Sequence, residues 1–164
     1  MGRVGEVPTD ASPAALLERV YREQGDRMWR ALYAYAGDAE IASDALSEAF
    51  AQALRRGDAI READRWVWRS AFRIAAGEMK RRRSEIGGIG AEPTYEMEEP
   101  ARELLEALRS LSAKQRAAVV LHHAGGYPVR EVAAIIGSTT AAVKVHLMRG
   151  RRRLRELLRE DDIA

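Results

Sequence analysis

The side chains of this sequence that are best suited to binding a ligand are basic. They lie near the end of the sequence at helical spacing. Lys144, Arg149 and Arg151 belong to a run rich in arginine, and such cations bind nucleic-acid phosphates or the acceptor edges of bases. Val143 and Leu147 are one helical turn apart and predict the buried side of the same helix. The predicted contacts to duplex DNA are Thr139, Thr140, Lys144, Val145, Met148, Arg149 and Arg151.

The residues before this helix predict the turn that presents it. Residues 129–136 have an amphipathic helical pattern, and Gly137 follows; glycine suits a tight turn because it tolerates positive φ. The hydroxyls of Thr139 and Thr140 are suited to capping the next helix. A short helix, a glycine turn and a capped basic helix are typical of a DNA-reading helix-turn-helix. The alternative is an ordinary helical hairpin with a solvated basic face.

A second basic segment, residues 65–83, carries tryptophans among its arginines. Helical spacing predicts that Trp68 and Phe72 are buried and that the opposite face is exposed. Aromatic rings stack on unpaired bases while cations follow the phosphates, so this face suits single-stranded DNA. In the alternative, Trp66 packs on a neighbouring helix and the arginines are only solvated. The predicted single-strand contacts are Arg65, Trp66, Arg69, Arg73 and Lys80.

A third predicted helix, residues 39–56, carries an acidic and polar face. Asp44, Ser47, Glu48 and Gln52 are spaced so that they lie together on that face. The hypothesis is a docking face for a basic partner protein, and the alternative is a plain solvated helix face.

Composition limits the class of protein. With 164 residues and 46% hydrophobic residues, the chain is expected to fold, as one medium domain or two small ones. The absence of cysteine excludes disulfides and thiolate metal sites.

No residue set forms a catalytic constellation or a phosphate-binding glycine loop, so we expect no enzymatic activity, cofactor or metal. No apolar run is long enough to span a bilayer, and no signal peptide is present; we expect a cytoplasmic protein without membrane insertion.

Helical periodicity throughout the chain predicts an all-α fold of two small domains. Residues 87–100 contain four glutamates and no Lys or Arg, whereas residues 101–164 carry twelve Lys and Arg against seven Asp and Glu. This contrast predicts different partners for the two segments. We expect a polar tail at 1–13, a first domain at 14–85, a flexible acidic linker at 86–100, and a four-helix helix-turn-helix domain at 101–164.

Taken together, these segments resemble a bacterial extracytoplasmic-function (ECF) sigma factor over residues 14 to about 158. GDAEIASDALSEAFAQAL is similar to the family segment that leads to D-x-x-Q-E-x-F, with Asp44, Glu48 and Phe50 matching and Ser47 in place of glutamine. RWVWRSAFRIA is similar to the family's W-L-Y-R-I-A-R-N. The basic helix resembles T-V-K-S-R-L-x-R-A-R, and the matching residues are Val143, Lys144, Leu147, Arg149 and Arg151.

The resemblance implies a subunit that binds core RNA polymerase and directs it to promoter DNA. The first domain would bind the clamp helices of the β′ subunit through Asp44, Ser47 and Glu48, and would capture the unpaired minus-ten strand. The second would dock on the β flap and read the minus-thirty-five element as duplex. An anti-sigma factor would hold the protein inactive. The linker glutamates would mimic nucleic acid in a basic polymerase channel; these are Glu92, Glu96, Glu98 and Glu99.

Two other classes of protein fit parts of the sequence. A stand-alone helix-turn-helix regulator would account for residues 128–154, but such proteins usually dimerise and residues 65–83 would stay unexplained. A sigma-like adaptor that binds only protein would not need the basic face of residues 144–153.

Overall fold

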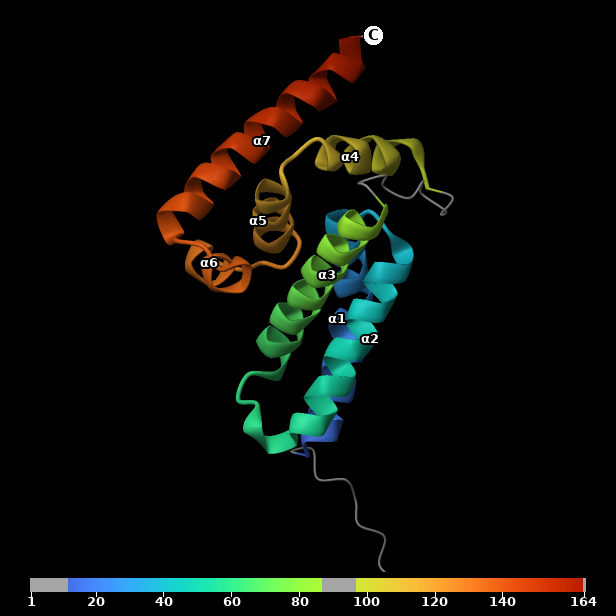
Figure 1. Ribbon diagram of the computed structural model, residues 1–164, viewed down its shortest axis with the longest axis vertical. Helices are drawn as coiled ribbons and strands as arrows, with labels where there is room; N and C mark the ends of the chain where they lie inside the picture. The colour runs from blue at the N-terminus through green and yellow to red at the C-terminus, as the bar shows by residue number, and fades with distance from the viewer. Residues whose placement is uncertain (1–11, 87–96, 164) are drawn as a thin grey trace, which may run out of the picture.

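The structure is a computed structural model that describes residues 12–86 and 97–163, and within these ranges every regular element is a helix (Figure 1). The all-α fold predicted from the sequence is confirmed. The polar tail falls almost wholly outside the described residues, as do Glu92 and Glu96 of the expected linker. The elements are α1 (Pro13–Ala36), α2 (Ala39–Arg56), the 3₁₀ helix η1 (Gly57–Ala59), α3 (Ala63–Ile86), α4 (Glu99–Arg109), α5 (Ala113–His123), α6 (Val129–Ile136) and α7 (Thr140–Ile163).

Helices α1, α2 and α3 pack lengthwise against one another and form what we call the first unit (Figure 1). Its centre is apolar, with Met28, Leu32 and Trp68 almost fully buried. Asp38 joins two of the helices. Its Oδ1 accepts hydrogen bonds from the first backbone N–H groups of α2, and its Oδ2 lies 2.7 Å from Nη1 of Arg82 on α3. The beginning of α2 is thereby fixed to the end of α3.

Helices α4 to α7 form the second unit. Ser112 and Gln115 make a capping box at the start of α5. Helix α7 lies close to α5 because Gly150 faces it: a Cβ at this position would lie 2.9 Å from Cγ2 of Val119. Of the leucines on α4, Leu108 is buried, but Leu104 is 44% exposed.

The two units contact each other through α1 and α3 on one side and α5 and α6 on the other (Figure 1). Trp68 of α3 meets the ring of Tyr127 edge to face, with the ring centroids 5.9 Å apart. Arg116 of α5 donates from Nε to the backbone carbonyl of Tyr35 at 2.7 Å. The described residues therefore share one continuous apolar core across both units.

Candidate nucleic-acid interface

The helix-turn-helix predicted from the sequence is formed by α6, the turn at Gly137 and α7. Gly137 adopts φ 65° and ψ 45°, the left-handed conformation that glycine reaches without strain. Oγ1 of Thr139 accepts a hydrogen bond from the backbone N–H of Ala142 at 3.1 Å, so the expected threonine cap is present. On the inner side, Val143 and Leu147 are buried against the second unit. The opposite side of α7 is thereby turned outward.

Most of the predicted duplex contacts lie on this outward side. Thr139, Thr140, Lys144 and Arg149 are exposed, as are the apolar side chains of Val145 and Met148. An exposed valine and methionine beside two cations suit contact with base edges, where thymine methyl groups and purine acceptors lie together.

Arg151 has a different environment from the other predicted duplex contacts. It is half-buried, and its Nε donates to Nε2 of His123 on α5 at 3.0 Å. Burial, and then the charge of Arg151, lower the pKa of His123, which keeps the ring neutral and able to accept that hydrogen bond. Arg151 is therefore held against α5.

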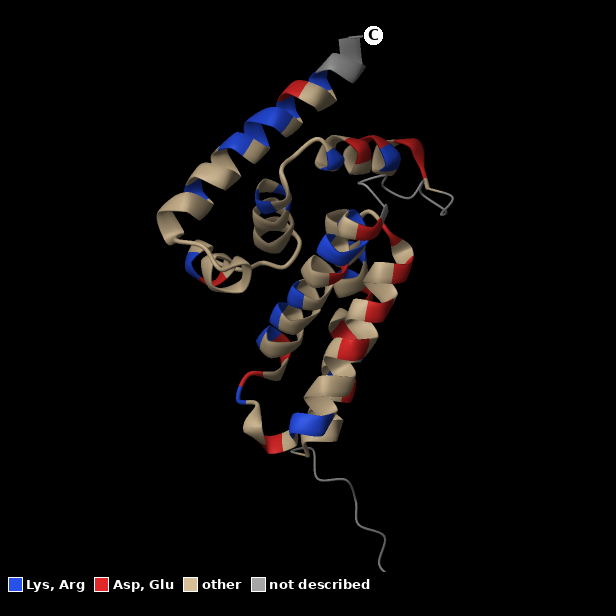
Figure 2. Ribbon diagram, viewed as in Figure 1, with Lys and Arg blue, Asp and Glu red and all other residues tan. Residues whose placement is uncertain are grey.

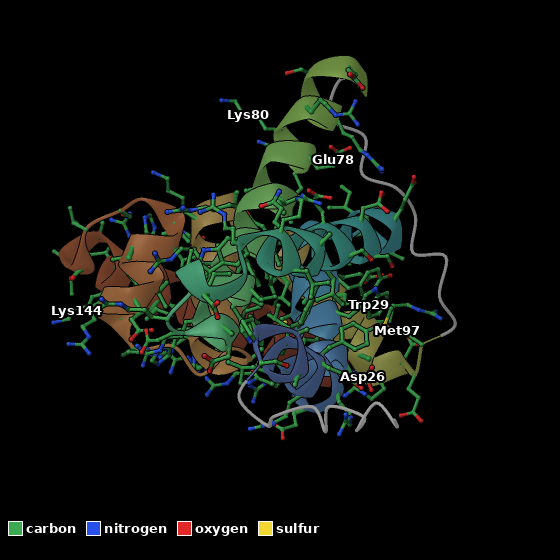
Figure 3. All side chains as sticks on the ribbon, turned by 90° about the horizontal axis from the view of Figure 1, so that it is seen from below. Asp26, Trp29, Glu78, Lys80, Met97 and Lys144 are labelled. Atoms are coloured by element: carbon green, nitrogen blue, oxygen red, sulfur yellow. The ribbon has the colours of Figure 1, made fainter. Side chains whose placement is uncertain are left out.

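The predicted single-strand contacts on α3 divide into two groups. Arg69 and Lys80 are exposed and make no ion pair within the described part of the chain, and Lys80 points outward in Figure 3. Arg65 instead pairs with Glu131 of α6 at 3.0 Å and with Glu62 at 3.3 Å. Arg73 borders a cavity between the two units. The second unit thus lies against two of the five predicted residues.

Trp66 is half-buried and packs against the core. The guanidinium of Arg56 lies over its ring, 5.4 Å from the ring centroid. The ring is thus neither fully packed nor fully free, and the two interpretations offered by the sequence each hold in part. Trp68 is buried as predicted, and its Nε1 donates to Oε1 of Gln24 at 2.9 Å.

The acidic face of α2 points outward, on a different helix from the basic side chains of α3 and α7 (Figure 2). Asp44, Ser47 and Glu48 are all exposed. Oε1 of Glu48 accepts hydrogen bonds from Gln52 and from Arg55, each at 3.0 Å. These bonds lower the pKa of Glu48, with the larger contribution from Gln52, so the carboxylate stays ionised at neutral pH.

Several residues of this region were not singled out by the sequence. Glu131, Tyr127 and Arg116 each contact the first unit, but the residues around each of them in the sequence give no indication of it. These contacts join residues far apart in the chain, so no local periodicity or motif would have identified them. Gly150 carried a weak indication, since a glycine inside a helix usually has a packing reason.

The described residues hold no cluster of side chains with metal-ligand geometry. None of the described helices is both long enough and apolar enough to cross a bilayer.

Comparison with known proteins identifies this arrangement. Residues 101–154, which include α5, α6 and the first part of α7, match the family described as Sigma-70, region 4. Across 92% of its length the chain is 28% identical to the ECF RNA polymerase sigma factor SigL of Mycobacterium tuberculosis, of which it covers 93%. The likeness thus extends through both units.

In sequence the whole chain is thus similar to ECF sigma factors. The resemblance in its motifs is confirmed, as is its function as an RNA polymerase sigma factor that acts at promoters. A stand-alone regulator would not account for a likeness that includes α1 to α3.

Solved structures of other sigma factors share the fold. The sigma factor RpoE from Bartonella quintana, solved with the anti-sigma factor NepR, superposes with a TM-score of 0.73 at 22% identity over 89% of this chain and 96% of that chain. CnrH, solved with the cytosolic domain of CnrY, gives a TM-score of 0.67 at 20% identity and covers 88% of each chain. At these identities the comparison bears on the fold alone.

Proposed function

We propose that the sigma factor divides promoter recognition between its two units. Residues 14–85 act as the domain that binds core polymerase and the opened strand, residues 101–164 act as the duplex-reading domain, and residues 86–100 link them. The observation that carries this proposal is the presence of two separate basic surfaces, at Arg69 and Lys80 on α3 and at Lys144 and Arg149 on α7. Each surface suits a different form of DNA.

The N-terminal half of α7 enters the major groove of the minus-thirty-five element. Val143 and Leu147 hold the helix against the second unit, which leaves the opposite side free to meet DNA. Lys144 and Arg149 bind bases or phosphates, Val145 and Met148 contact apolar base edges, and the first turn at Thr139 and Thr140 donates N–H groups to a phosphate. Arg151 contributes positive charge from a more restrained position, since His123 accepts its Nε–H.

Helix α3 captures the unpaired non-template strand of the minus-ten element. Arg69 and Lys80 are available to its phosphates in the arrangement described here. Arg65 and Arg73 are exposed as well, but one pairs with Glu131 and the other borders the cavity between the units, so both become more accessible when the second unit moves away. Separation of the two units therefore favours strand capture. Trp66 supplies the ring on which a base stacks, once Arg56 has moved from its face.

The outward face of α2 binds core polymerase at the β′ clamp helices. The carboxylates of Asp44 and Glu48 favour a basic partner surface, and Ser47 adds a hydroxyl between them. The second unit docks on the β flap. The protein acts without catalysis of its own and without a cofactor, in the cytoplasm where the polymerase is.

An anti-sigma factor controls the protein. RpoE and CnrH, which share this fold, were each solved with a protein partner, NepR in one case and CnrY in the other. A partner that holds the two units together keeps Arg65 paired with Glu131 and Arg73 beside the cavity, and so disfavours strand capture.

Run-off transcription with purified core polymerase tests the proposal. Adding this chain should produce promoter-dependent transcripts from a pool of genomic fragments, and the chain should co-purify with core polymerase. As a matched pair, Asp44→Ala with Glu48→Ala should weaken co-purification, whereas Glu18→Ala on the exposed surface of α1 should not. Absence of both transcript and co-purification would contradict the proposal.

A further inference from the structure

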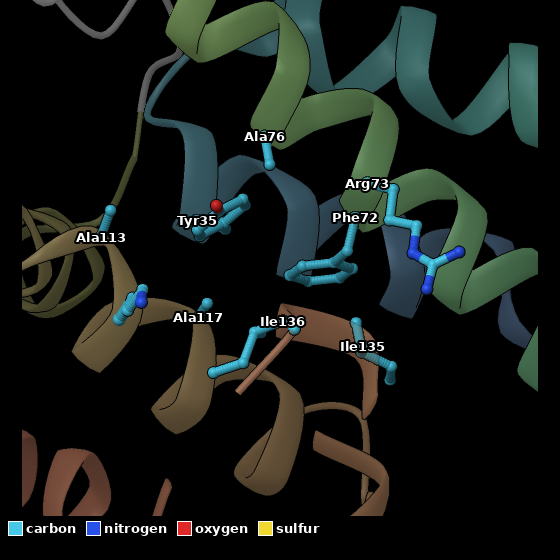
Figure 4. Close-up of a pocket in the computed structure, with 10 residues that line it drawn as sticks. Tyr35, Phe72, Arg73, Ala76, Ala113, Ala117, Ile135 and Ile136 are labelled. Atoms are coloured by element: carbon cyan, nitrogen blue, oxygen red, sulfur yellow. The ribbon is translucent and has the colours of Figure 1, made fainter. Parts of the chain in front are cut away.

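A cavity of about 400 Å³ lies between the two units, with walls from α1 and α3 on one side and α5 and α6 on the other (Figure 4). Its walls are largely apolar and include Phe72, Ala76, Ala117, Ile135 and Ile136. Cavities of this size at the boundary between two packed units are where proteins usually hold small molecules. Nothing in the sigma-factor mechanism argued above uses this space.

Tyr35 brings an unpaired polar group to the cavity. Its side chain is only 7% exposed, and its ring stacks on Phe72 with the centroids 5.3 Å apart. The tyrosine lines the cavity, and its hydroxyl makes no hydrogen bond to any residue that the structure describes. No side-chain polar atom of the described residues is both fully buried and unpaired, so this hydroxyl is reached by solvent through the cavity and is available to a bound molecule. Burial raises the pKa of Tyr35, which keeps the hydroxyl protonated and able to donate.

The charge around the cavity is positive and is not balanced by acidic groups. Arg73 and Lys114 are among its lining residues, and none of the lining residues is acidic. Arg116 lies beside them with its guanidinium 5.7 Å from the ring centroid of Tyr35, and it donates to backbone carbonyls, not to a carboxylate. Within the described residues, none of these three cations forms an ion pair. A bound anion would balance this positive charge.

We propose that this cavity binds a small amphipathic anion. Its apolar body packs against Phe72, Ile135 and Ile136, and its anionic group accepts a hydrogen bond from the Tyr35 hydroxyl while Arg73 or Lys114 neutralises its charge. Medium-chain carboxylates and aromatic sulfonates have this chemistry.

Binding at this position favours the arrangement in which the units are in contact, because each unit supplies part of the cavity. A ligand that binds only one arrangement shifts the population toward it. In that arrangement Arg65 is paired with Glu131 and Arg73 borders the cavity. The anion therefore reduces the capture of single-stranded DNA. This consequence, unlike the binding itself, rests on the proposed function.

Binding is measured on the full chain alone, with 8-anilinonaphthalene-1-sulfonate as a fluorescent probe and octanoate as its competitor. We expect saturable binding at one site per chain, and displacement by octanoate. Tyr35→Phe removes only the hydroxyl and should weaken probe binding several-fold, Lys114→Glu should weaken it about tenfold, and Ile136→Trp should abolish it by filling the cavity. Arg22→Glu and Leu104→Trp are the matched controls at exposed residues that do not line the cavity, and they should bind the probe as the unchanged chain does.

Three results would overturn the proposal. The first is probe binding that does not saturate or that ignores both Tyr35→Phe and Lys114→Glu. The second is equal affinity for octanol and octanoate, which would exclude an anion site. The third is failure of both anions while an amphipathic helical peptide binds, which would assign the cavity to a protein partner. Since this assay contains neither polymerase nor DNA, its result is independent of the run-off experiment. Inhibition of run-off transcription by octanoate then tests the consequence separately.

Discussion

Glu131 pairs with Arg65 across the boundary between the two units, and the pair is the most specific polar contact there. The carboxylate is 16% exposed and the guanidinium 47%. A pair that is partly open to solvent contributes modestly, on the order of 0.2–1 kcal/mol. Its importance lies in its position, because it occupies a cation that the proposed strand capture needs.

Glu131→Gln should therefore favour separation of the units. The lost attraction corresponds to a shift of roughly 1.4- to fivefold in the population of separated molecules, and binding of single-stranded minus-ten DNA should rise by a similar factor. Small-angle scattering measures the first effect and fluorescence anisotropy the second. Glu156→Gln is the matched control, since Glu156 pairs with Arg153 within α7 at 3.6 Å and touches no boundary. Equal behaviour of the two variants would contradict the account of Arg65.

At the scale of the helices, local features of the sequence predicted where several helices begin and end. The bounds of α2 and α6 agree with those expected, because the aspartate cap at Asp38 and the left-handed glycine at Gly137 are local features. The capping box of α5 is local for the same reason. What the sequence could not predict is which helix faces lie against each other, since Glu131 and Arg65 are 66 residues apart in the chain. For the same reason, the sequence could not decide whether Trp66 packs on a neighbouring helix or is exposed to stack on a base.

Two helical glycines with opposite surroundings test the packing of the elements. Gly77 in α3 is exposed and a Cβ there would meet nothing within 4 Å, whereas a Cβ at Gly150 would lie 2.9 Å from Val119. Gly77→Ala should stabilise the protein by about 0.5–1 kcal/mol because alanine favours the helix. Gly150→Ala should lose that gain and destabilise by about 1 kcal/mol or more, because Val119 must move.

Thermal unfolding measures both effects, and 1 kcal/mol corresponds to a shift in Tm of about 2–4 °C for a chain of this size. The two alanine variants should move Tm in opposite directions. A rise in Tm for Gly150→Ala as large as that for Gly77→Ala would mean that α7 does not approach α5 closely at Gly150.

At the scale of the whole molecule, the two proposed DNA-binding surfaces lie on units that contact each other. The surface on α7 is open in this arrangement, with Lys144 and Arg149 exposed. The surface on α3 is only partly open, since Arg69 is exposed while Arg65 is paired. The molecule as described is therefore suited to meeting duplex DNA first and to capturing an opened strand only after the units separate. We interpret the contact between α3 and α6 as the step that orders these events.

This order separates the effects of substitutions on the two helices. Lys144→Ala or Arg149→Ala removes a contact to duplex DNA and should weaken promoter binding by roughly 1–3 kcal/mol if the residue meets a base. Arg69→Ala should leave duplex binding nearly unchanged and impair opening of the minus-ten element. Arg22→Ala, on the exposed surface of α1, is the charge-matched control and should change neither.

The most direct test is run-off transcription from two templates that differ only in the minus-ten element, which is fully paired in one and mismatched, and so already open, in the other. We predict that the defect of Arg69→Ala is large on the paired template and mostly relieved on the open one, because the strand no longer has to be separated. The defect of Lys144→Ala should be equal on both, because the minus-thirty-five element is duplex in each. If the two variants lost activity in the same proportion on both templates, the division of promoter recognition between α3 and α7 would be wrong.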